Sequence, residues 1–211
     1  MTNLAIVSGG LREPSSTRLL ADRIGEAVRT ELSRAAVSAS VSVIELRRLG
    51  RPIMDAMLTG FATSELEDAF ETLARADGLI AVTPAFNASF SGLFKSFFDV
   101  LPEGTLSDVP VLIAATGGTE RHSLVLEHAL RPMFSYLHAV VSPTGVYAAT
   151  DDFGAGGNQA RLSERIGKAA ADFARLLRSC GPHIRRDPFA DELAEMERLL
   201  GGSGPDRPDS R

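Results

Sequence analysis

Short apolar stretches alternate with longer stretches of helical periodicity along most of the chain. The apolar stretches are rich in β-branched residues and end at small or polar ones; they cover residues 4–7, 41–46, 78–83, 109–115 and 140–147. Between them, apolar side chains recur every three or four residues, as on one face of an amphipathic helix. The main helical stretches cover residues 16–36, 64–76, 91–101 and 158–178. This alternation predicts an α/β fold with a parallel sheet covered by helices on both faces.

Five β–α units of this length resemble the flavodoxin-like doubly wound fold, whose five parallel strands follow the order 2-1-3-4-5. We expect a single domain of this kind over residues 1–180. Four apolar residues in the extension 181–200 predict a short amphipathic helix, which packs on its own subunit or contacts another one. These residues are Phe189, Leu193, Met196 and Leu200. Residues 201–211 are mostly Gly, Pro, Ser and charged residues, which predicts a flexible tail.

The composition excludes several classes of protein. Of the 211 residues, 44% are hydrophobic and 23% are charged, which is ordinary for a soluble globular protein. The formal net charge of −5 argues against nucleic-acid binding, which requires a basic surface. No apolar run approaches the roughly 20 residues of a membrane span, and residues 3–8 resemble a strand rather than a signal peptide. The single cysteine, Cys180, suits a reducing compartment, so we expect a soluble cytoplasmic protein.

The sequence lacks the motifs of metal sites and of serine hydrolases. The four histidines show no spacing typical of a metal site, and the Gly-x-Ser-x-Gly pattern of serine hydrolases is missing. Asp151 and Asp152 are adjacent, so their side chains point apart, and a solvated loop explains them better than an acid/base pair. We therefore expect neither a metal nor a catalytic side chain.

The segment between the first strand and the first helix predicts a phosphate site. In an open parallel sheet, ligands bind beyond the carboxyl ends of the strands. Residues 8–18 lead into a helix N-terminus, where backbone N–H groups and the helix dipole favour an anion. The segment also supplies hydroxyl and guanidinium donors, namely Arg12, Ser15, Ser16, Thr17 and Arg18. Neither the Walker nor the Rossmann glycine pattern is present, and ordinary helix capping by Ser or Thr is the alternative interpretation.

The segment after the third strand predicts a site for a flat ring. Pro84 restricts Thr83 to extended backbone, so the strand ends in a shaped turn. Phe86 can flank a planar ligand, whereas core packing under the loop explains Phe90 better. We expect backbone groups of this segment to hydrogen-bond the edge of the ring. The candidate residues are Thr83, Pro84, Ala85, Phe86 and Asn87.

Two glycines follow the fourth strand. Gly117 and Gly118 lie between Thr116 and Thr119, and glycine allows backbone to approach a ligand closely. A plain turn is the alternative for this segment taken alone. Together, the three segments predict a pocket with one end for a phosphate and the other for an aromatic ring. This is the shape of flavin mononucleotide (FMN).

These segments resemble the NAD(P)H-dependent FMN reductases of the flavodoxin-like fold. The likeness is strongest to the alkanesulfonate-type reductases, which supply reduced flavin to two-component monooxygenases. It covers roughly residues 3–178. It is carried by residues 12–15, 76–84, 89–95, 115–119 with His122, 129–132 and 145–152.

The resemblance implies roles for the candidate residues. Arg12, Ser15 and Thr17 would hold the FMN phosphate, residues 83–87 would line the isoalloxazine ring, and residues 116–119 would contact its pyrimidine side and the ribityl chain. The first segment reads Gly-Gly-Leu-Arg at residues 9–12, where relatives often have Gly-Ser-Pro-Arg. One hydroxyl ligand of the phosphate is therefore missing.

Pro132 interrupts an apolar helical pattern. It has no N–H to donate to the carbonyl of His128, four residues earlier, which predicts a kink or a π-bulge near His128. In the alkanesulfonate-type reductases that the chain resembles, a π-helix with an inserted aromatic residue lies at the matching position of the subunit interface. It accompanies the use of FMN as a substrate that leaves. His128 stands where some relatives have Tyr, and a surface histidine without a chemical role is the alternative.

The leading hypothesis is an NAD(P)H:FMN oxidoreductase that passes reduced flavin to a flavin-dependent monooxygenase. The resemblance implies a homodimer or homotetramer, because a neighbouring subunit completes the flavin pocket in the family. One alternative keeps FMN bound and reduces quinones or azo compounds. A flavodoxin-type electron carrier fits less well, because the chain has no Trp and two Tyr. No motif decides between NADH and NADPH.

Overall fold

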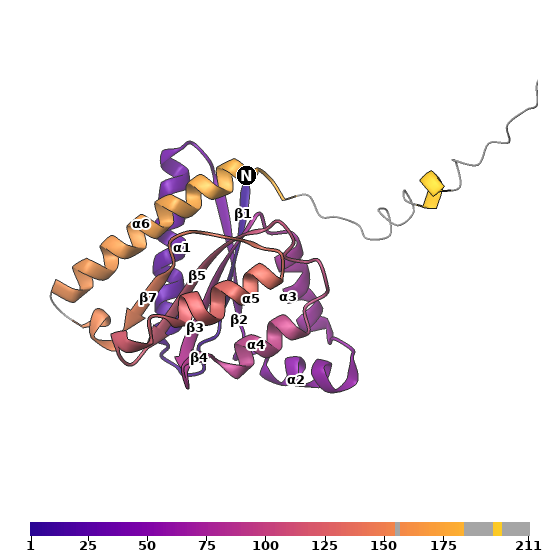
Figure 1. Cartoon of the computed structure of the whole chain (residues 1–211), viewed down its shortest axis with the longest axis horizontal. Helices are drawn as coiled ribbons and strands as arrows, with labels where there is room; N and C mark the ends of the chain where they lie inside the picture. Colours follow the sequence, from indigo (N-terminus) through magenta and orange to yellow (C-terminus); the bar gives the residue numbers. More distant parts are fainter. Residues whose placement is uncertain (155–156, 184–195, 200–211) are drawn as a thin grey trace, which may run out of the picture.

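A parallel sheet forms the centre of the computed structural model, which describes residues 1–154, 157–183 and 196–199. β1 (Thr2–Ser8) lies between β2 (Ala39–Glu45) and β3 (Gly78–Phe86), and β5 (Pro110–Gly117) follows β3. Beyond β5, the short strands β6 (Val140–Val141) and β7 (Val146–Ala149) both pair with it in parallel. The order β2-β1-β3-β5-β6 confirms the expected flavodoxin-like order (Figure 1).

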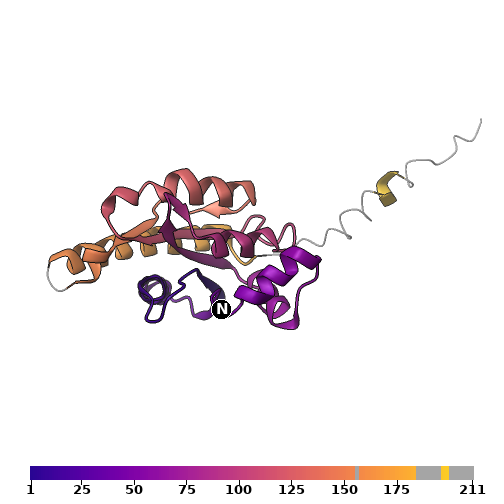
Figure 2. The ribbon, with the colours of Figure 1, turned by 90° about the horizontal axis from the view of Figure 1, so that it is seen from below.

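Helices cover both faces of this sheet, as the sequence predicts. α1 (Ser16–Arg34) and α6 (Gly157–Cys180) pack against each other over one face. The other face is covered by α2 (Gly50–Thr59), α3 (Ser64–Ala74), α4 (Gly92–Asp99) and α5 (Arg131–Tyr136). In Figure 2, α1 (indigo) and α5 (salmon) lie on opposite sides of the strands.

The central strands β1, β3 and β5 are largely apolar because both of their faces are buried. In β1, Ala5 and Val7 belong to the core under α2–α5, while Leu4 and Ile6 belong to the core under α1 and α6. Successive side chains of a strand point to opposite faces, so a sheet between two helical layers needs apolar residues at every position. This constraint explains the continuous apolar runs of the central strands; β2, at the edge of the sheet, is more exposed and contains Ser40 and Ser42.

The expected fifth strand over residues 140–147 is divided in two. β6 pairs with the start of β5 and β7 with its end, and residues 142–145 between them leave the ladder. Pro143 has no N–H to donate to a strand. Arg131, in α5, stabilises the segment between the two strands, because its guanidinium donates to the carbonyls of Ser142 (3.0 Å) and Pro143 (3.2 Å).

A small hairpin replaces the loop expected after the third strand. β4 (Ser89–Phe90) turns back antiparallel on the end of β3, with Phe86 opposite Ser89. The two turn residues, Asn87 and Ala88, have φ of 48° and 65°. Two left-handed residues in a two-residue connection are typical of a type I′ turn, which matches the twist of the strands.

The remaining elements are short, and they follow β5 and β7. They are the 3₁₀ helix η1 (Glu120–His122), the π-helix η2 (Leu126–Leu130) and the 3₁₀ helix η3 (Thr150–Phe153). Of the predicted C-terminal helix, residues 196–199 are helical, while 184–195 and the predicted tail lie outside the described residues. Among the residues described, no helix is long and apolar enough to cross a membrane.

Replacing Ala88 by Gly is expected to raise the free energy of unfolding by about 0.5–1 kcal/mol. A β-carbon in the left-handed region costs about 1–2 kcal/mol, part of which is offset by the greater freedom of Gly in the unfolded chain. Thermal unfolding measures the change, as an increase of roughly 1–4 °C in Tm. The matched variant Asn87→Gly should gain less, because Asn tolerates this region. A lower Tm for Ala88→Gly would contradict the turn assignment.

Candidate functional site

The three predicted ligand-binding segments are residues 8–18 (the first segment), 83–87 (the second) and 116–119 (the third). They meet at one edge of the sheet. β1, β3 and β5 are neighbours, and their carboxyl ends lie together because the strands are parallel. The Gly9 N–H donates to the Val82 carbonyl (2.8 Å), which joins the first segment to β3. Pro84 in β3 is the register partner of Thr116 in β5, which joins the second segment to the third.

A buried hydrogen bond links the first and third segments directly. The hydroxyls of Thr17 and Thr116 lie 2.8 Å apart, and both residues are almost wholly buried. Thr17 is in the first turn of α1, and Thr116 is next to the last residue of β5. The two hydroxyls predicted to contact the ligand therefore bond each other.

The first segment folds its serine hydroxyl back on the chain. Ser15 is the N-cap of α1, and its Oγ accepts a hydrogen bond from the Arg18 N–H (3.1 Å). Gly10 is required here, because a β-carbon at this position would overlap the Ser15 hydroxyl. Ser16 and Arg12 are exposed, and Arg12 forms no hydrogen bond or ion pair with any residue the structure describes.

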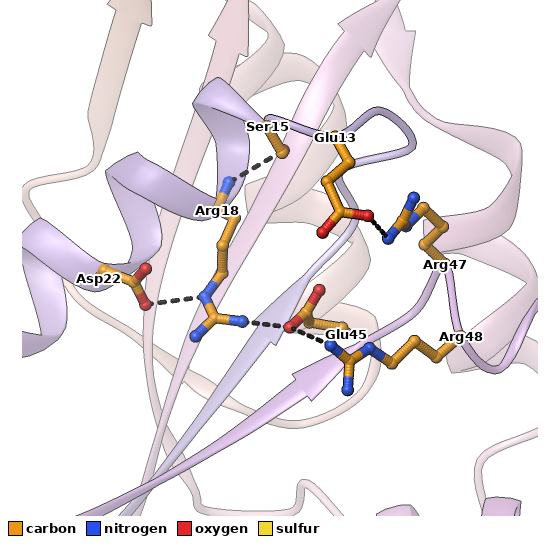
Figure 3. A network of polar contacts seen from close by, with 7 residues as sticks. All are labelled: Glu13, Ser15, Arg18, Asp22, Glu45, Arg47 and Arg48. Atoms are coloured by element: carbon orange, nitrogen blue, oxygen red, sulfur yellow. Dashed lines mark hydrogen bonds and ion pairs between the residues drawn. The ribbon is translucent and has the colours of Figure 1, made fainter.

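Arg18 belongs to an ion-pair network instead of pointing freely at a ligand (Figure 3). Its Nε donates to Asp22 (2.8 Å), and its Nη1 donates to Glu45 at the end of β2. The hydrogen bond that Arg18 donates to Asp22 is the main reason why the pKa of Arg18 is raised. Arg48 also lies near Glu45 (3.7 Å). The network ties α1 to β2 beside the first segment.

The loop itself is joined to the chain after β2 by a second ion pair. Glu13 accepts a hydrogen bond from Arg47, as Figure 3 shows. The charged residues around Arg18 and Glu13 line an open groove of about 350 Å³ next to Gly10 and Arg12. Of the guanidinium groups in this groove, that of Arg12 is the one without a partner among the described residues.

In the second segment, some side chains are buried and stabilise the turn, while others are exposed to solvent. Thr83 is fully buried, and its Oγ1 accepts from the Ser91 N–H (3.1 Å) and donates to the Pro84 carbonyl (3.1 Å). It therefore shapes the turn into α4. Ala85 is partly buried, while Phe86 is 47% exposed and Asn87 is also exposed. Phe86 is thus the aromatic side chain of this segment that is accessible to a planar ligand.

Phe90 is partly buried and packs against the core, as predicted. It lies against the buried cluster under α2–α5, with its ring 6.2 Å from that of Phe94. Phe94 is fully buried and contacts Phe98 edge to face at 4.9 Å. These rings hold the hairpin from beneath.

The third segment leaves the sheet with two exposed residues. Gly118 and Thr119 are exposed, and a β-carbon at Gly118 would meet no atom within 4 Å. The Thr119 carbonyl accepts a hydrogen bond from the hydroxyl of Tyr147 (2.7 Å). Burial is the main reason why the pKa of Tyr147 is raised, and Asp152 adds to it. Tyr147 is not among the predicted site residues, and its place in the stretch 145–152 is the one sequence feature that includes it.

Asp152 is buried, so the expectation of a solvated loop is wrong for this residue. It is 6% exposed, and its Oδ2 accepts hydrogen bonds from the Ala149 N–H (2.8 Å) and from Arg165 of α6 (2.8 Å). It therefore joins the end of β7 to α6. Neither bond places this carboxylate among the ligand-binding segments.

The predicted π-bulge is present. In the π-helix η2, the Arg131 N–H donates to the carbonyl of Leu126, five residues earlier. Pro132 follows directly and cannot donate to His128. His128 is exposed. The guanidinium of Arg131 is held by Glu127, and this hydrogen bond is the main reason why the pKa of Glu127 is lowered.

This edge of the sheet suits a phosphorylated aromatic ligand. The first turn of α1 and the unpaired Arg12 favour an anion. Phe86 supplies an exposed ring face, and the open backbone at Gly118 lets a ligand approach. These features fit the two ends of FMN.

Comparison with known proteins identifies the family. Residues 2–154 match the model of the NADPH-dependent FMN reductases. This chain belongs to that family. It is accordingly an oxidoreductase that acts with FMN and a nicotinamide nucleotide.

Individual relatives are similar along most of their length. The NADH-dependent FMN reductase SfnE of Pseudomonas putida is 38% identical over 174 residues, which cover 82% of this chain and 86% of SfnE. An FMN reductase (NADPH) of Pseudomonas aeruginosa is 42% identical over 147 residues, covering 70% of this chain and 76% of the relative. Among solved structures, an oxidoreductase from Corynebacterium diphtheriae matches with a TM-score of 0.81 at 50% identity, covering 85% of this chain and 98% of that one.

Replacing Thr17 by Val is expected to lower the free energy of unfolding by about 1–3 kcal/mol, because the Thr116 hydroxyl is then buried without a partner. Chemical denaturation measures the change. In the double variant Thr17→Val/Thr116→Val no hydroxyl is left unpaired, so its stability should return toward that of the wild type. A single variant as stable as the wild type would contradict the role given to this bond.

Proposed function

We propose that the protein reduces FMN as a substrate that leaves, and that a flavin-dependent monooxygenase receives the reduced flavin. The π-helix η2 carries this proposal. In the alkanesulfonate-type reductases that the chain resembles, a π-helix at the matching position accompanies flavin release. Here it lies between the third segment and α5, with His128 exposed on it. His128 is our candidate for a role in flavin transfer or in the subunit contact.

We place the FMN phosphate at the start of α1. The N–H groups of the first turn and the guanidinium of Arg12 would bind it, with Ser15 and Ser16 beside them. Because the hydroxyl of Thr17 is bonded to Thr116, these two residues would contribute through their backbone and by fixing the segments.

We place the flavin ring between the second and third segments. Phe86 would contact its face, while backbone groups of Pro84, Ala85 and Asn87 would meet its edge. Gly117, Gly118 and Thr119 would approach its pyrimidine side. Thr83 supports this arrangement from beneath, because its hydroxyl is engaged with Ser91 and Pro84.

The reaction requires no acid or base from this chain. When bound, the flavin accepts a hydride directly from the nicotinamide, and the protein binds, orients and stabilises charge. Backbone N–H groups near Asn87 and Gly118 are oriented before the reaction and would stabilise negative charge on the ring. Few charged side chains would hold the ligand, since Arg18 and Arg47 are engaged with acidic residues. Weak anchoring of this kind suits a flavin that leaves.

We also propose a homodimer or homotetramer in the cytoplasm. Leu124 and Tyr136, on either side of the π-helix, are 60% and 84% exposed. Leu58 and Phe61, at the end of α2 and just after it, are each 79% exposed. Apolar side chains exposed in groups mark surfaces that contact other proteins, and a subunit on the π-helix side would cover the first pair.

Steady-state oxidation of NADH and of NADPH, with and without added FMN, tests the proposed function. We expect the protein to be largely colourless as purified and its turnover to saturate with added FMN. The same measurement gives the preferred nucleotide. The proposal would be contradicted if the protein retains FMN and its turnover is independent of added FMN but requires a quinone or an azo dye. That result would favour a quinone or azo reductase.

Replacing Arg12 by Ala is expected to weaken FMN binding by about 1.5–3 kcal/mol, or roughly 10- to 150-fold in Kd, because a charged hydrogen bond to the phosphate is lost. Riboflavin, which lacks the phosphate, should bind both proteins equally. Quenching of flavin fluorescence measures each Kd. Arg75→Ala is the matched control, since Arg75 is an exposed arginine paired with Glu71 at the opposite edge of the sheet. An unchanged Kd for FMN would remove Arg12 from the site.

A further inference from the structure

Tyr147 lies directly beneath the third segment. It is in β7, beside Ala115 of β5, and it is 8% exposed. Its hydroxyl donates to the carbonyl of Thr119 (2.7 Å), two residues beyond the end of β5. It thus joins a core strand to a segment that is otherwise exposed.

Gly117 provides the space for the phenol. A β-carbon at Gly117 would overlap the Tyr147 hydroxyl and would lie 3.1 Å from Cζ of the ring. The absence of a side chain at this glycine therefore has a structural reason on the protein side. At Gly118, by contrast, a β-carbon would meet open space. The two glycines, which the sequence presents as equivalent, have different surroundings.

The strand that carries Tyr147 is anchored to α6. Arg165 donates to the Tyr147 carbonyl (3.3 Å) and to Asp152 (2.8 Å), and Asp152 accepts from the Ala149 N–H (2.8 Å). Thr150 adds a long contact to the Gly117 carbonyl (3.5 Å). Because β7 is anchored in this way, the Tyr147 hydroxyl restrains the position of the Thr119 carbonyl.

Fixing the Thr119 carbonyl also fixes the N–H of the same peptide unit. In a trans peptide the C=O and the N–H point in opposite directions. The N–H of Glu120 therefore points away from Tyr147. The Thr119 carbonyl also accepts from the His122 N–H (3.4 Å), and the bond from the phenol hydroxyl is the shorter of the two. The orientation of this peptide unit therefore depends in part on Tyr147.

We propose that Tyr147 is a positioning residue, whose hydroxyl holds residues 117–119 in the conformation that binds the flavin ring. This inference rests on the proposed function, because that function places the ring against the third segment. Tyr147 itself would not touch the reacting atoms. It would act on flavin affinity through the Thr119 carbonyl.

The variant Tyr147→Phe tests this role, since it removes the hydroxyl and keeps the ring. We expect the Kd for FMN, measured by fluorescence quenching, and the KM for FMN to rise about five- to tenfold, as for one neutral hydrogen bond. The KM for the nicotinamide nucleotide, the kcat at saturating FMN and the Tm should change little. Thr72→Val is the control and should behave as the wild type, since it also removes one hydroxyl that donates to a backbone carbonyl, that of Asp68 (2.8 Å) in α3, away from the three segments.

The outcomes separate this inference from the proposed function. If the wild type reduces and binds FMN but Tyr147→Phe has the same Kd and KM for FMN, the positioning role is overturned and the proposed function stands. A general fall in Tm with equal rises in both KM values would also overturn it, since this is the effect of a merely structural residue. If the wild type neither binds nor reduces FMN, the proposed function fails and this inference fails with it.

Discussion

The hydrogen bond between Thr17 and Thr116 is the contact on which the geometry of the site depends. It joins the first turn of α1 to the end of β5, and β3 lies between β1 and β5 in the sheet. Both hydroxyls are buried, where an unpaired polar group costs more free energy than at the surface. The bond therefore sets the position of the first segment, with the helix end proposed to bind the phosphate, relative to the third segment. The second segment lies between them because β3 pairs with both β1 and β5.

Hydrogen bonds within the chain use most of the hydroxyls at this edge of the sheet. Thr17 bonds Thr116, Thr83 holds the turn into α4, and Ser15 caps α1. A ligand is left with backbone N–H groups, the unpaired Arg12 and the exposed face of Phe86. Such a site is well ordered without the ligand, because its own contacts fix it. The proposed site would also bind the flavin through few side chains, which suits the proposed release of FMN.

The sequence predicts the framework because local patterns determine it. Apolar runs between two helical layers specify the parallel sheet, and the strand order then brings the three segments together. Pro132 predicts the π-helix because the missing N–H is a property of one residue. Hydrogen bonds and ion pairs between residues far apart in the sequence cannot be predicted from local patterns. Nothing near Thr17 in the sequence indicates Thr116 as its partner, 99 residues away. Asp152 meets Arg165 only because η3 packs on α6, and the turn at Asn87 and Ala88 lacks the glycine that usually marks a hairpin.

We propose that the ends of β1, β3 and β5 form a single site for FMN. Amide hydrogen exchange of the protein with and without FMN tests this proposal. We expect slower exchange in three separate stretches at once, residues 10–18, 85–88 and 117–120, with little change at the opposite edge of the sheet. Protection confined to one stretch, or protection elsewhere on the molecule, would contradict it.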